Sequence, residues 1–441
     1  MTRVAGRDRR ELFPKSLVLL FAAAPLAALQ AGVAVDPAVT PEQRAALLSR
    51  VETLEAELQE IKAQLAAPGT PEPTLVETES EPAEALDIRS VGNVGLLMDG
   101  YYSYNFNQPA DGLNPLRAYD RRHNSFGLNQ AALVFDREPE PEQGRRFGVR
   151  VDLMYGQATD ALQGSPLNEL RPDMYRPVFQ AYGTYVAPVG SGLTIDFGKW
   201  ASALGLEGNY TLDQVNYSRS YLFNFLPFYH FGFRARYDFT DQWGASYWLV
   251  NGNGQSDDFN GLKSNAFFGH WKPSPRVETN LAYYTGNENN TRAFPGEGRR
   301  ALDGKLHIVY DQTLWSVTDR LSLGAELAYI NNRETSASPP STALGGGALA
   351  SFDLNDRWSL GARYERVSDG GGFLTGRRQL LQEATFTLSQ RVAERFLVRY
   401  EVRRDASSRA FFTTDRAGLL ARQQTTALLG LTWWLGREGG W

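Results

Sequence analysis

The fold is decided by a stretch that reads Tyr229-His230-Phe231-Gly232-Phe233-Arg234-Ala235-Arg236-Tyr237-Asp238-Phe239. Aromatic residues and one alanine occupy the odd positions, whereas polar residues and one glycine occupy the even positions. Because successive side chains of a strand point to opposite faces, this alternation predicts a strand with one apolar face and one polar face.

The same alternation recurs from residue 91 to the C-terminus. Its clearest further examples lie at residues 147–155, 321–329, 358–365 and 396–403. A soluble β-sandwich would produce the same pattern, so the alternation alone does not decide whether these strands face water or lipid.

The connections between the predicted strands are of two kinds. Short polar turns are expected at residues 138–144, 187–192, 240–242, 272–275, 317–319, 355–357 and 392–394. Long polar or Gly/Asn-rich links are expected at 107–124, 156–176, 200–227, 252–262, 288–300, 332–342, 368–378 and 404–421. Eight long links that alternate with seven short ones join about sixteen strands. This order predicts an all-β transmembrane barrel of antiparallel strands, with periplasmic turns and extracellular loops.

Aromatic residues support a membrane environment independently. Trp243, Trp358 and Phe396 directly follow short turns, and tyrosines lie near the opposite strand ends on the same faces, at Tyr155, Tyr283, Tyr329, Tyr364 and Tyr400. A bilayer selects aromatic belts at both of its interfaces, which a sandwich does not require. The last strand, with apolar residues from Leu429 to Leu435, is expected to close the barrel. Trp441 suits recognition by barrel-assembly machinery, although residues 436–440 separate it from that strand.

The first ninety residues precede this pattern and have three parts. Residues 1–34 have the basic start, apolar run and small residues of a signal peptide cleaved after Ala31 or Ala34; an uncleaved anchor is the alternative. Residues 41–67 predict a short periplasmic coiled-coil helix, or a lone surface helix, from an a/d seam of Leu47, Val51, Leu54, Leu58, Ile61 and Leu65. Residues 68–90 are rich in acid and proline and predict a linker to the barrel at 91–441.

Composition excludes several other classes of protein. The chain has no cysteine, which removes disulfide scaffolds, thiolate metal sites and a lipoprotein anchor. After residue 90, basic and acidic residues are equally frequent at 36 each, which argues against a nucleic-acid binder. Only four histidines are present, and they form no recognisable catalytic or metal-binding pattern. We therefore expect no enzymatic activity, no metal and no cofactor.

The barrel segment resembles the OmpL-like outer-membrane β-barrel porin family. The resemblance rests on residues 100–107 (GYYSYNFN), 126–131 (FGLNQA), 148–153 (GVRVDL), 197–199 (FGK), 205–207 (GLE), 216–220 (NYSRS) and 250–252 (VNG). It covers residues 91 to about 260 well. The heptad helix is similar to the periplasmic coils that precede several trimeric porins. The resemblance implies an outer-membrane pore, surrounded by outer-membrane lipid and assembled as a homotrimer with its coil in the periplasm of a Gram-negative-type bacterium.

Charged residues on the polar face of each strand are the candidate pore lining. The basic candidates are Arg150, Arg234, Arg236, Lys305, Arg363, Arg399 and Arg403, and the acidic ones are Asp99, Asp152, Asp196, Asp238, Glu278, Asp311, Glu326, Glu365 and Glu401. Charges of both signs in a water-filled lumen favour small polar solutes over apolar ones. The plain alternative is that most of these residues are solvated or paired residues of the wall.

The longest link, from Ala201 to Phe228, contains the apolar run 221–228 (YLFNFLPF). A loop this apolar is expected to fold inward or to cap a neighbour in an oligomer. Arg219 is our candidate constriction residue, with a structural arginine that ties the loop to the wall as the alternative. The sequence thus predicts a porin for passive diffusion, and its rival is a structural or adhesive barrel with a plugged lumen.

Overall fold

The computed structural model describes residues 41–66, 91–162, 169, 171–288 and 303–437. The chain divides into an N-terminal unit, residues 1–84, and a barrel unit, residues 85–441. The segments predicted as signal peptide and linker lie outside the described residues.

The described part of the N-terminal unit is helix α1 (Pro41–Ala66). The helix predicted from the heptad seam is therefore confirmed. Val51, Leu54 and Leu58 of the seam are about half exposed, at 49 %, 56 % and 51 %. The coiled coil itself stays a prediction. None of the described helices combines the length and apolar character needed to cross a membrane.

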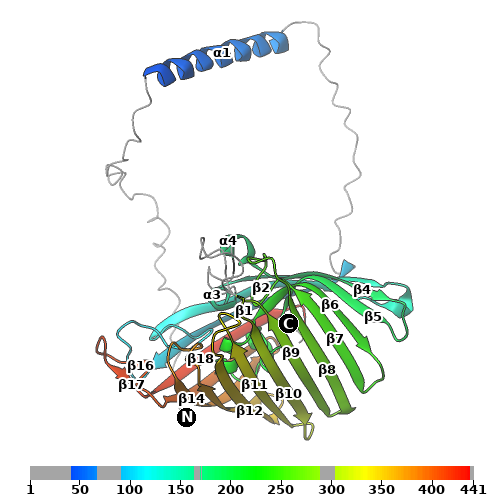
Figure 1. Cartoon of the computed structure of the whole chain (residues 1–441), viewed down its shortest axis with the longest axis vertical. Helices are drawn as coiled ribbons and strands as arrows, with labels where there is room; N and C mark the ends of the chain where they lie inside the picture. The colour runs from blue at the N-terminus through cyan, green and yellow to red at the C-terminus, as the bar shows by residue number, and fades with distance from the viewer. Residues whose placement is uncertain (1–40, 67–90, 163–168, 170, 289–302, 438–441) are drawn as a thin grey trace, which may run out of the picture. The chain divides into compact units, whose positions relative to one another are not determined.

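The barrel unit is a closed antiparallel sheet of sixteen strands, as predicted (Figure 1). Each strand pairs with its neighbours in the chain, and the last strand pairs with the first. The strands are β1 (Asn93–Asn105), β2 (Ser125–Arg137), β3 (Phe147–Tyr155), β4 (Val178–Ala187), β5 (Leu193–Ala201), β6 (Tyr229–Asp238), β7 (Trp243–Val250), β8 (Ser264–Ser274), β9 (Val277–Gly286), β10 (Leu306–Ser316), β11 (Leu321–Asn332), β12 (Ser341–Asn355), β13 (Trp358–Asp369), β14 (Gln379–Ala393), β15 (Phe396–Ser407) and β18 (Gln423–Leu435).

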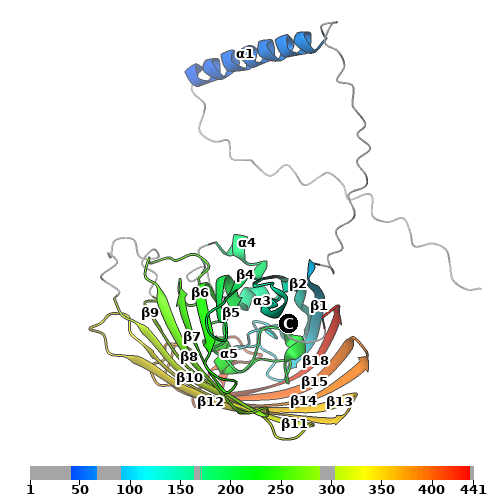
Figure 2. The same ribbon diagram turned by 90° about the vertical axis from the view of Figure 1, so that its right-hand side faces the viewer.

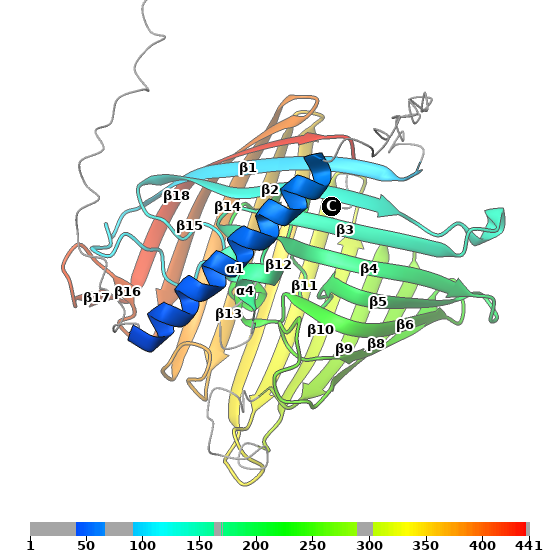
Figure 3. The same cartoon turned by 90° about the horizontal axis from the view of Figure 1, so that it is seen from above.

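Short turns and long loops alternate around the barrel, which confirms the predicted order of connections. Three turns are shorter than expected because β8 runs on to Ser274, β12 to Asn355 and β14 to Ala393, each through an irregularity in the pairing register. Such bulges let a strand continue past an extra residue. The last long loop contains a small separate hairpin of β16 (Phe412–Thr413) and β17 (Leu420–Ala421). Figure 3 shows β2 to β6 running side by side along one side of the wall.

The outer wall carries the predicted aromatic residues. Near the short turns Trp243 stacks on Trp271, and Phe396 stacks on Trp433, with ring centroids 5.3 and 4.6 Å apart. The tyrosines expected at the long-loop ends also face outward, and their exposed fractions range from 38 to 58 %. Exposed rings on both ends of the outer face are suited to the two interfaces of a bilayer.

The link between β5 and β6, residues 202–228, folds into the barrel, and we call it the lumen loop (Figure 2). It contains a 3-10 turn, η2 (Thr211–Asp213), and the short helix α5 (Tyr221–Phe225). The side chains of Leu204, Leu222 and Leu226 are buried in one apolar cluster with inward-facing wall residues such as Trp248 and Tyr284. The inward fold expected for this loop is confirmed, because burial removes its apolar run from water.

Candidate functional site: the barrel lumen

Carboxylates of the wall bind the backbone of the lumen loop. Glu401 on β15 accepts a hydrogen bond from the backbone N–H of Tyr217 at 2.7 Å. Glu365 on β13 accepts from the N–H groups of Tyr221 and Leu222 at 2.5 and 2.7 Å. Each carboxylate satisfies donors that start or precede the short helix α5, where a negative charge is also favoured. These two residues therefore act as anchors of the loop.

Arginines of the same wall bind the carbonyl groups of the loop. Arg363 donates to the carbonyl of Ser218 at 2.7 Å and forms ion pairs with Glu207 and Glu383 at 2.6 and 2.8 Å. Arg403 donates to the carbonyl of Arg219 at 2.5 Å. Arg399 caps the 3-10 turn by donating to loop carbonyls at residues 211, 212 and 214. All three residues are at most 5 % exposed.

Glu207 is the loop's own charged contact with this wall. Burial by itself would raise the pKa of its carboxyl, but Arg363, Arg219 and the N–H and hydroxyl groups of Ser220 outweigh burial and hold that pKa below its ordinary value. The carboxylate form is therefore the stable one at neutral pH. Charge pairing keeps this part of the loop against β13.

The wall on the other side of the β18–β1 junction also binds the loop, here through the hydroxyl groups of loop tyrosines. Asp99 accepts a hydrogen bond from the hydroxyl of Tyr217 at 2.5 Å, and Asp152 accepts from Tyr210 at 2.7 Å. On the side of β13, two strands further along the sheet, Glu326 on β11 accepts a hydrogen bond from the N–H of Leu206 at 3.1 Å. A Cβ at Gly430 would lie only 2.3 Å from the ring of Tyr217, so the loop touches this wall closely. We call the surface made by β11, β13–β15, β18 and β1–β3 the anchoring wall.

Arg219 is not a constriction residue in this structure. Its side chain is 1 % exposed, and its guanidinium donates to the carbonyls of Gly208 and Tyr217 at 3.1 and 2.8 Å. It also lies over the ring of Tyr119, 4.8 Å from the centroid. The alternative of a structural arginine fits this geometry, although the contacts tie the loop mainly to itself rather than to the wall.

Most of the remaining candidates lie on the short-turn half of β5 to β9, which we call the open wall, whereas the long-loop half of the same strands packs against the lumen loop. Arg234 pairs with Asp196 at 2.6 Å and its side chain is 25 % exposed. Arg236 and Asp238 pair at 3.1 Å with both side chains 52 % exposed. Glu278 is exposed on β9. Arg150, on β3, lies between the two classes: it pairs with Asp152 and is 14 % exposed.

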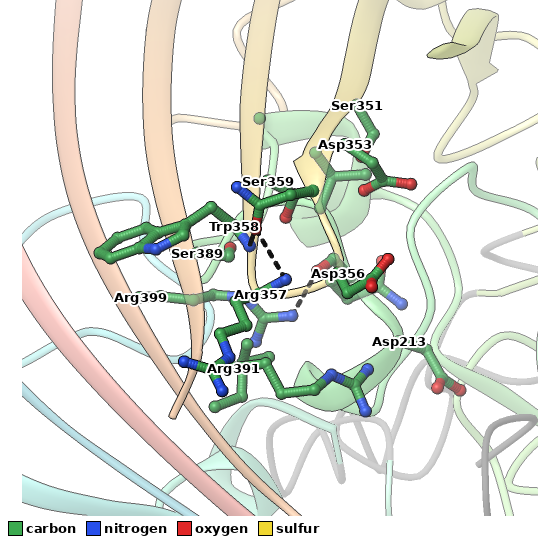
Figure 4. A pocket seen from close by; sticks show the side chains of 15 residues that line it. Asp213, Ser351, Asp353, Asp356, Arg357, Trp358, Ser359, Ser389, Arg391 and Arg399 are labelled. Carbon is green, nitrogen blue, oxygen red and sulfur yellow. Dashed lines mark hydrogen bonds between the residues drawn. The ribbon is translucent and has the colours of Figure 1, made fainter. Parts of the chain in front are cut away.

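Two cavities open at the short-turn end of the lumen. One, of about 430 Å³, is lined by Arg236, Asp238 and Glu278, and also by His270 and Lys272. The other, of about 250 Å³, lies between the lumen loop and the ends of β12 to β15. In Figure 4 its arginines gather on one side and its aspartates on the other; they are Arg357, Arg391, Arg399, Asp213, Asp353 and Asp356. Both signs of charge are therefore present where water enters.

Two predicted lumen residues point away from the lumen. Lys305 is exposed in phase with His307 and Val309, while the intervening Leu306 and Ile308 are buried inside the barrel. Asp311 pairs across the sheet with Leu327 and Leu281, both exposed on the outer wall. The error has one cause: on β10 the inward face is the apolar one, because it packs against the lumen-loop cluster.

Several residues of the lumen were missed from the sequence. Arg117, in the loop between β1 and β2, pairs with Asp120 and Asp405 at 2.7 Å and is fully buried. His270 of the open wall contacts Ser246 and Asn280 at 2.7 and 2.6 Å. A loop residue has no periodicity to reveal its direction. His270 does lie on the polar phase of its strand, and that signal could have found it.

Comparisons with known proteins agree with this architecture. Residues 93–433 match the family model described as "Putative beta-barrel porin-2, OmpL-like". Similar solved structures include the anion-selective porin from Comamonas acidovorans, with 9 % identity, a TM-score of 0.51, and coverage of 78 % of this chain and 99 % of that porin. OprB of Pseudomonas putida is similar at 13 % identity and a TM-score of 0.51, over 78 % and 94 % of the two chains. No curated protein matches the sequence. Because the family model spans most of the chain, this protein belongs to the OmpL-like β-barrel porin family of outer-membrane proteins.

Proposed function

We propose that this barrel is a passive diffusion channel for small polar solutes, and that solutes pass along the open wall. The observation that carries the proposal is the contrast in exposure across the lumen. Arg236, Asp238 and Glu278 keep half-exposed or exposed side chains and line a cavity, whereas the charged residues of the opposite wall are buried and bind the loop. Opposed charges beside water favour polar solutes and slow apolar ones.

The rival proposal is a structural or adhesive barrel with a plugged lumen. The buried apolar cluster favours it, because Leu204, Leu222 and Leu226 cover Trp248 and Tyr284 on the inner wall. For a channel, solutes must pass beside this cluster or the loop must shift. For the rival, the cluster is a permanent seal.

Single-channel recording on the purified full-length chain separates the two proposals. A porin gives stepwise, stable open-state currents in planar bilayers. Many insertions without current favour the plugged barrel. Protease protection of the reconstituted barrel checks the insertion, so that an absence of current is not mistaken for an absence of inserted protein.

We further propose that the chain is exported, inserted by barrel-assembly machinery and assembled as a homotrimer with α1 as a periplasmic coil. The half-exposed seam residues Val51, Leu54 and Leu58 support self-association, since a lone helix gains nothing from this apolar stripe. Deletion of residues 41–67 then leaves a conducting barrel but loosens the oligomer in mild detergent. A wild-type chain that is monomeric by mass measurement refutes this role.

A further inference from the structure

The outer wall has a broad apolar groove across β12 to β15, β18 and β1, which we call the groove face. The groove has a volume of about 700 Å³. Small residues form its floor, and Phe386, Tyr400 and Tyr102 stand around it; the small outward residues are Ala350, Ala362 and Ala427. An alternation of alanine and large rings on a lipid-facing wall leaves room for an inserted hydrocarbon chain.

Arginines lie directly above the groove face, at the long-loop end. Register places Arg366 of β13 beside Gln382 of β14, and Arg404 of β15 beside Ala384 of β14. The groove residues Phe386 and Ala362 follow two and four positions further down the same strands. Both arginines are exposed, as are Arg378, Arg409 and Arg422 in the adjoining loops.

This arginine cluster has no acidic partner among residues 303–437 and the other described parts of the chain. Arg404 donates to the amide oxygen of Gln423 at 2.5 Å, but no ion pair involves any of the five arginines. The acids of the same strands point inward and are buried: Glu365, Asp369, Glu383 and Asp405. Unpaired guanidinium groups at a membrane interface attract phosphate, which they can bind with two parallel hydrogen bonds.

We propose that the groove face binds a phosphorylated, multiply acylated saccharolipid of the lipid A type. Its phosphates would lie on Arg366 and Arg404, and its acyl chains would fill the groove below. Two observations favour this lipid over a phospholipid. Five unpaired arginines suit more than one phosphate. They lie at the long-loop end of the barrel, which in outer-membrane barrels faces the outside of the cell. The proposal does not depend on whether the lumen conducts.

Native mass spectrometry of the full chain in detergent tests the proposal. The probes are bis-phosphorylated lipid A, its dephosphorylated form and phosphatidylglycerol. We expect a bound adduct with the first that is at least tenfold weaker with the other two. Arg366→Gln combined with Arg404→Gln reduces binding of bis-phosphorylated lipid A at least tenfold. The matched control, Arg137→Gln with Arg320→Gln, removes two exposed arginines at the short-turn end and leaves binding unchanged.

Two further variants keep the test decisive if the arginine pair disturbs insertion. Ala362→Phe fills the groove without changing charge and weakens lipid A binding severalfold. Equal binding by wild type and variants overturns the proposal, as does equal affinity for phosphatidylglycerol. Ala362→Cys that forms disulfide-linked dimers in membranes also overturns it, because the groove face would then be a contact between two copies of the chain.

Discussion

The two sides of the lumen carry similar charged residues and use them differently. On the anchoring wall, Arg363, Arg403 and Glu401 are at most 5 % exposed and bind the loop backbone. On the open wall, Arg236 and Asp238 are about half exposed and pair with each other. The difference teaches that the type of residue on an inward strand position does not set its role. The role depends on whether the lumen loop covers the residue.

This contrast also explains why the loop is stable inside the barrel. A buried ion pair gains little over an apolar contact, but removal of one partner leaves the other buried and unpaired. The anchoring wall therefore resists displacement of the loop at each contact. The exposed pair of Arg236 and Asp238 on the open wall carries no such penalty, because water can solvate either partner.

The largest expected effect comes from Arg363→Met. The change removes the cation that lies 2.6 Å from Glu207 and 2.8 Å from Glu383, and leaves Glu383 with the more distant Arg403 at 3.4 Å. We expect a cost of about 3 to 5 kcal/mol in unfolding free energy. Urea unfolding in lipid vesicles measures it, and channel recording should show larger or noisier currents as the loop loosens. Arg236→Met on the open wall is the matched control and should change stability by no more than about 0.5 kcal/mol. Equal losses of unfolding free energy in Arg363→Met and Arg236→Met would contradict the distinction between the two walls.

The barrel could be predicted from the sequence because strand alternation and link lengths are local signals. Tyr229 to Phe239 shows its two faces without any knowledge of its neighbours. The inward direction of fourteen of the sixteen strand candidates follows from the same signal, and Lys305 and Asp311, at and on β10, are the two that fail. The roles could not be predicted. Whether Arg363 faces water depends on the lumen loop, whose path is set by contacts up to 188 residues apart in sequence.

A second test compares the outer wall with the open wall. Leu323→Arg places a charge in lipid and should cost about 2 to 4 kcal/mol near the bilayer midplane. Glu278→Arg changes an exposed inward residue and should alter stability by about 0.5 kcal/mol or less. Gly324 is a poor control, since a Cβ there would meet Leu206 of the lumen loop at 3.0 Å. Equal penalties for Leu323→Arg and Glu278→Arg would contradict the membrane assignment of the outer face.

A third test uses the misplaced carboxylate Asp311 on the outer wall. Between Leu327 and Leu281 it faces the apolar side, where an acid costs less than an arginine but is still unfavourable. Asp311→Leu should therefore stabilise the barrel by about 1 to 2 kcal/mol in vesicle unfolding, and Asp311→Asn by less. A loss of stability, or of oligomer, would instead mean that this carboxylate contacts a second copy of the chain.

The smallest effect concerns the ion selectivity of the open wall. Arg234→Gln with Arg236→Gln removes two positive charges of the open wall, of which Arg236 lines the cavity, so cations should pass more easily relative to anions. We expect a change on the order of twofold in the permeability ratio, equivalent to about 0.4 kcal/mol, measured as a shift of reversal potential in a salt gradient. Asp238→Asn with Glu278→Gln should shift it in the opposite direction. Arg137→Gln on the outer wall should leave it unchanged, because that side chain is separated from the lumen by the sheet. If neither pair of substitutions on the open wall changes the reversal potential while the channel still conducts, solutes do not pass along this wall. The conducting path must then lie between the lumen loop and the anchoring wall.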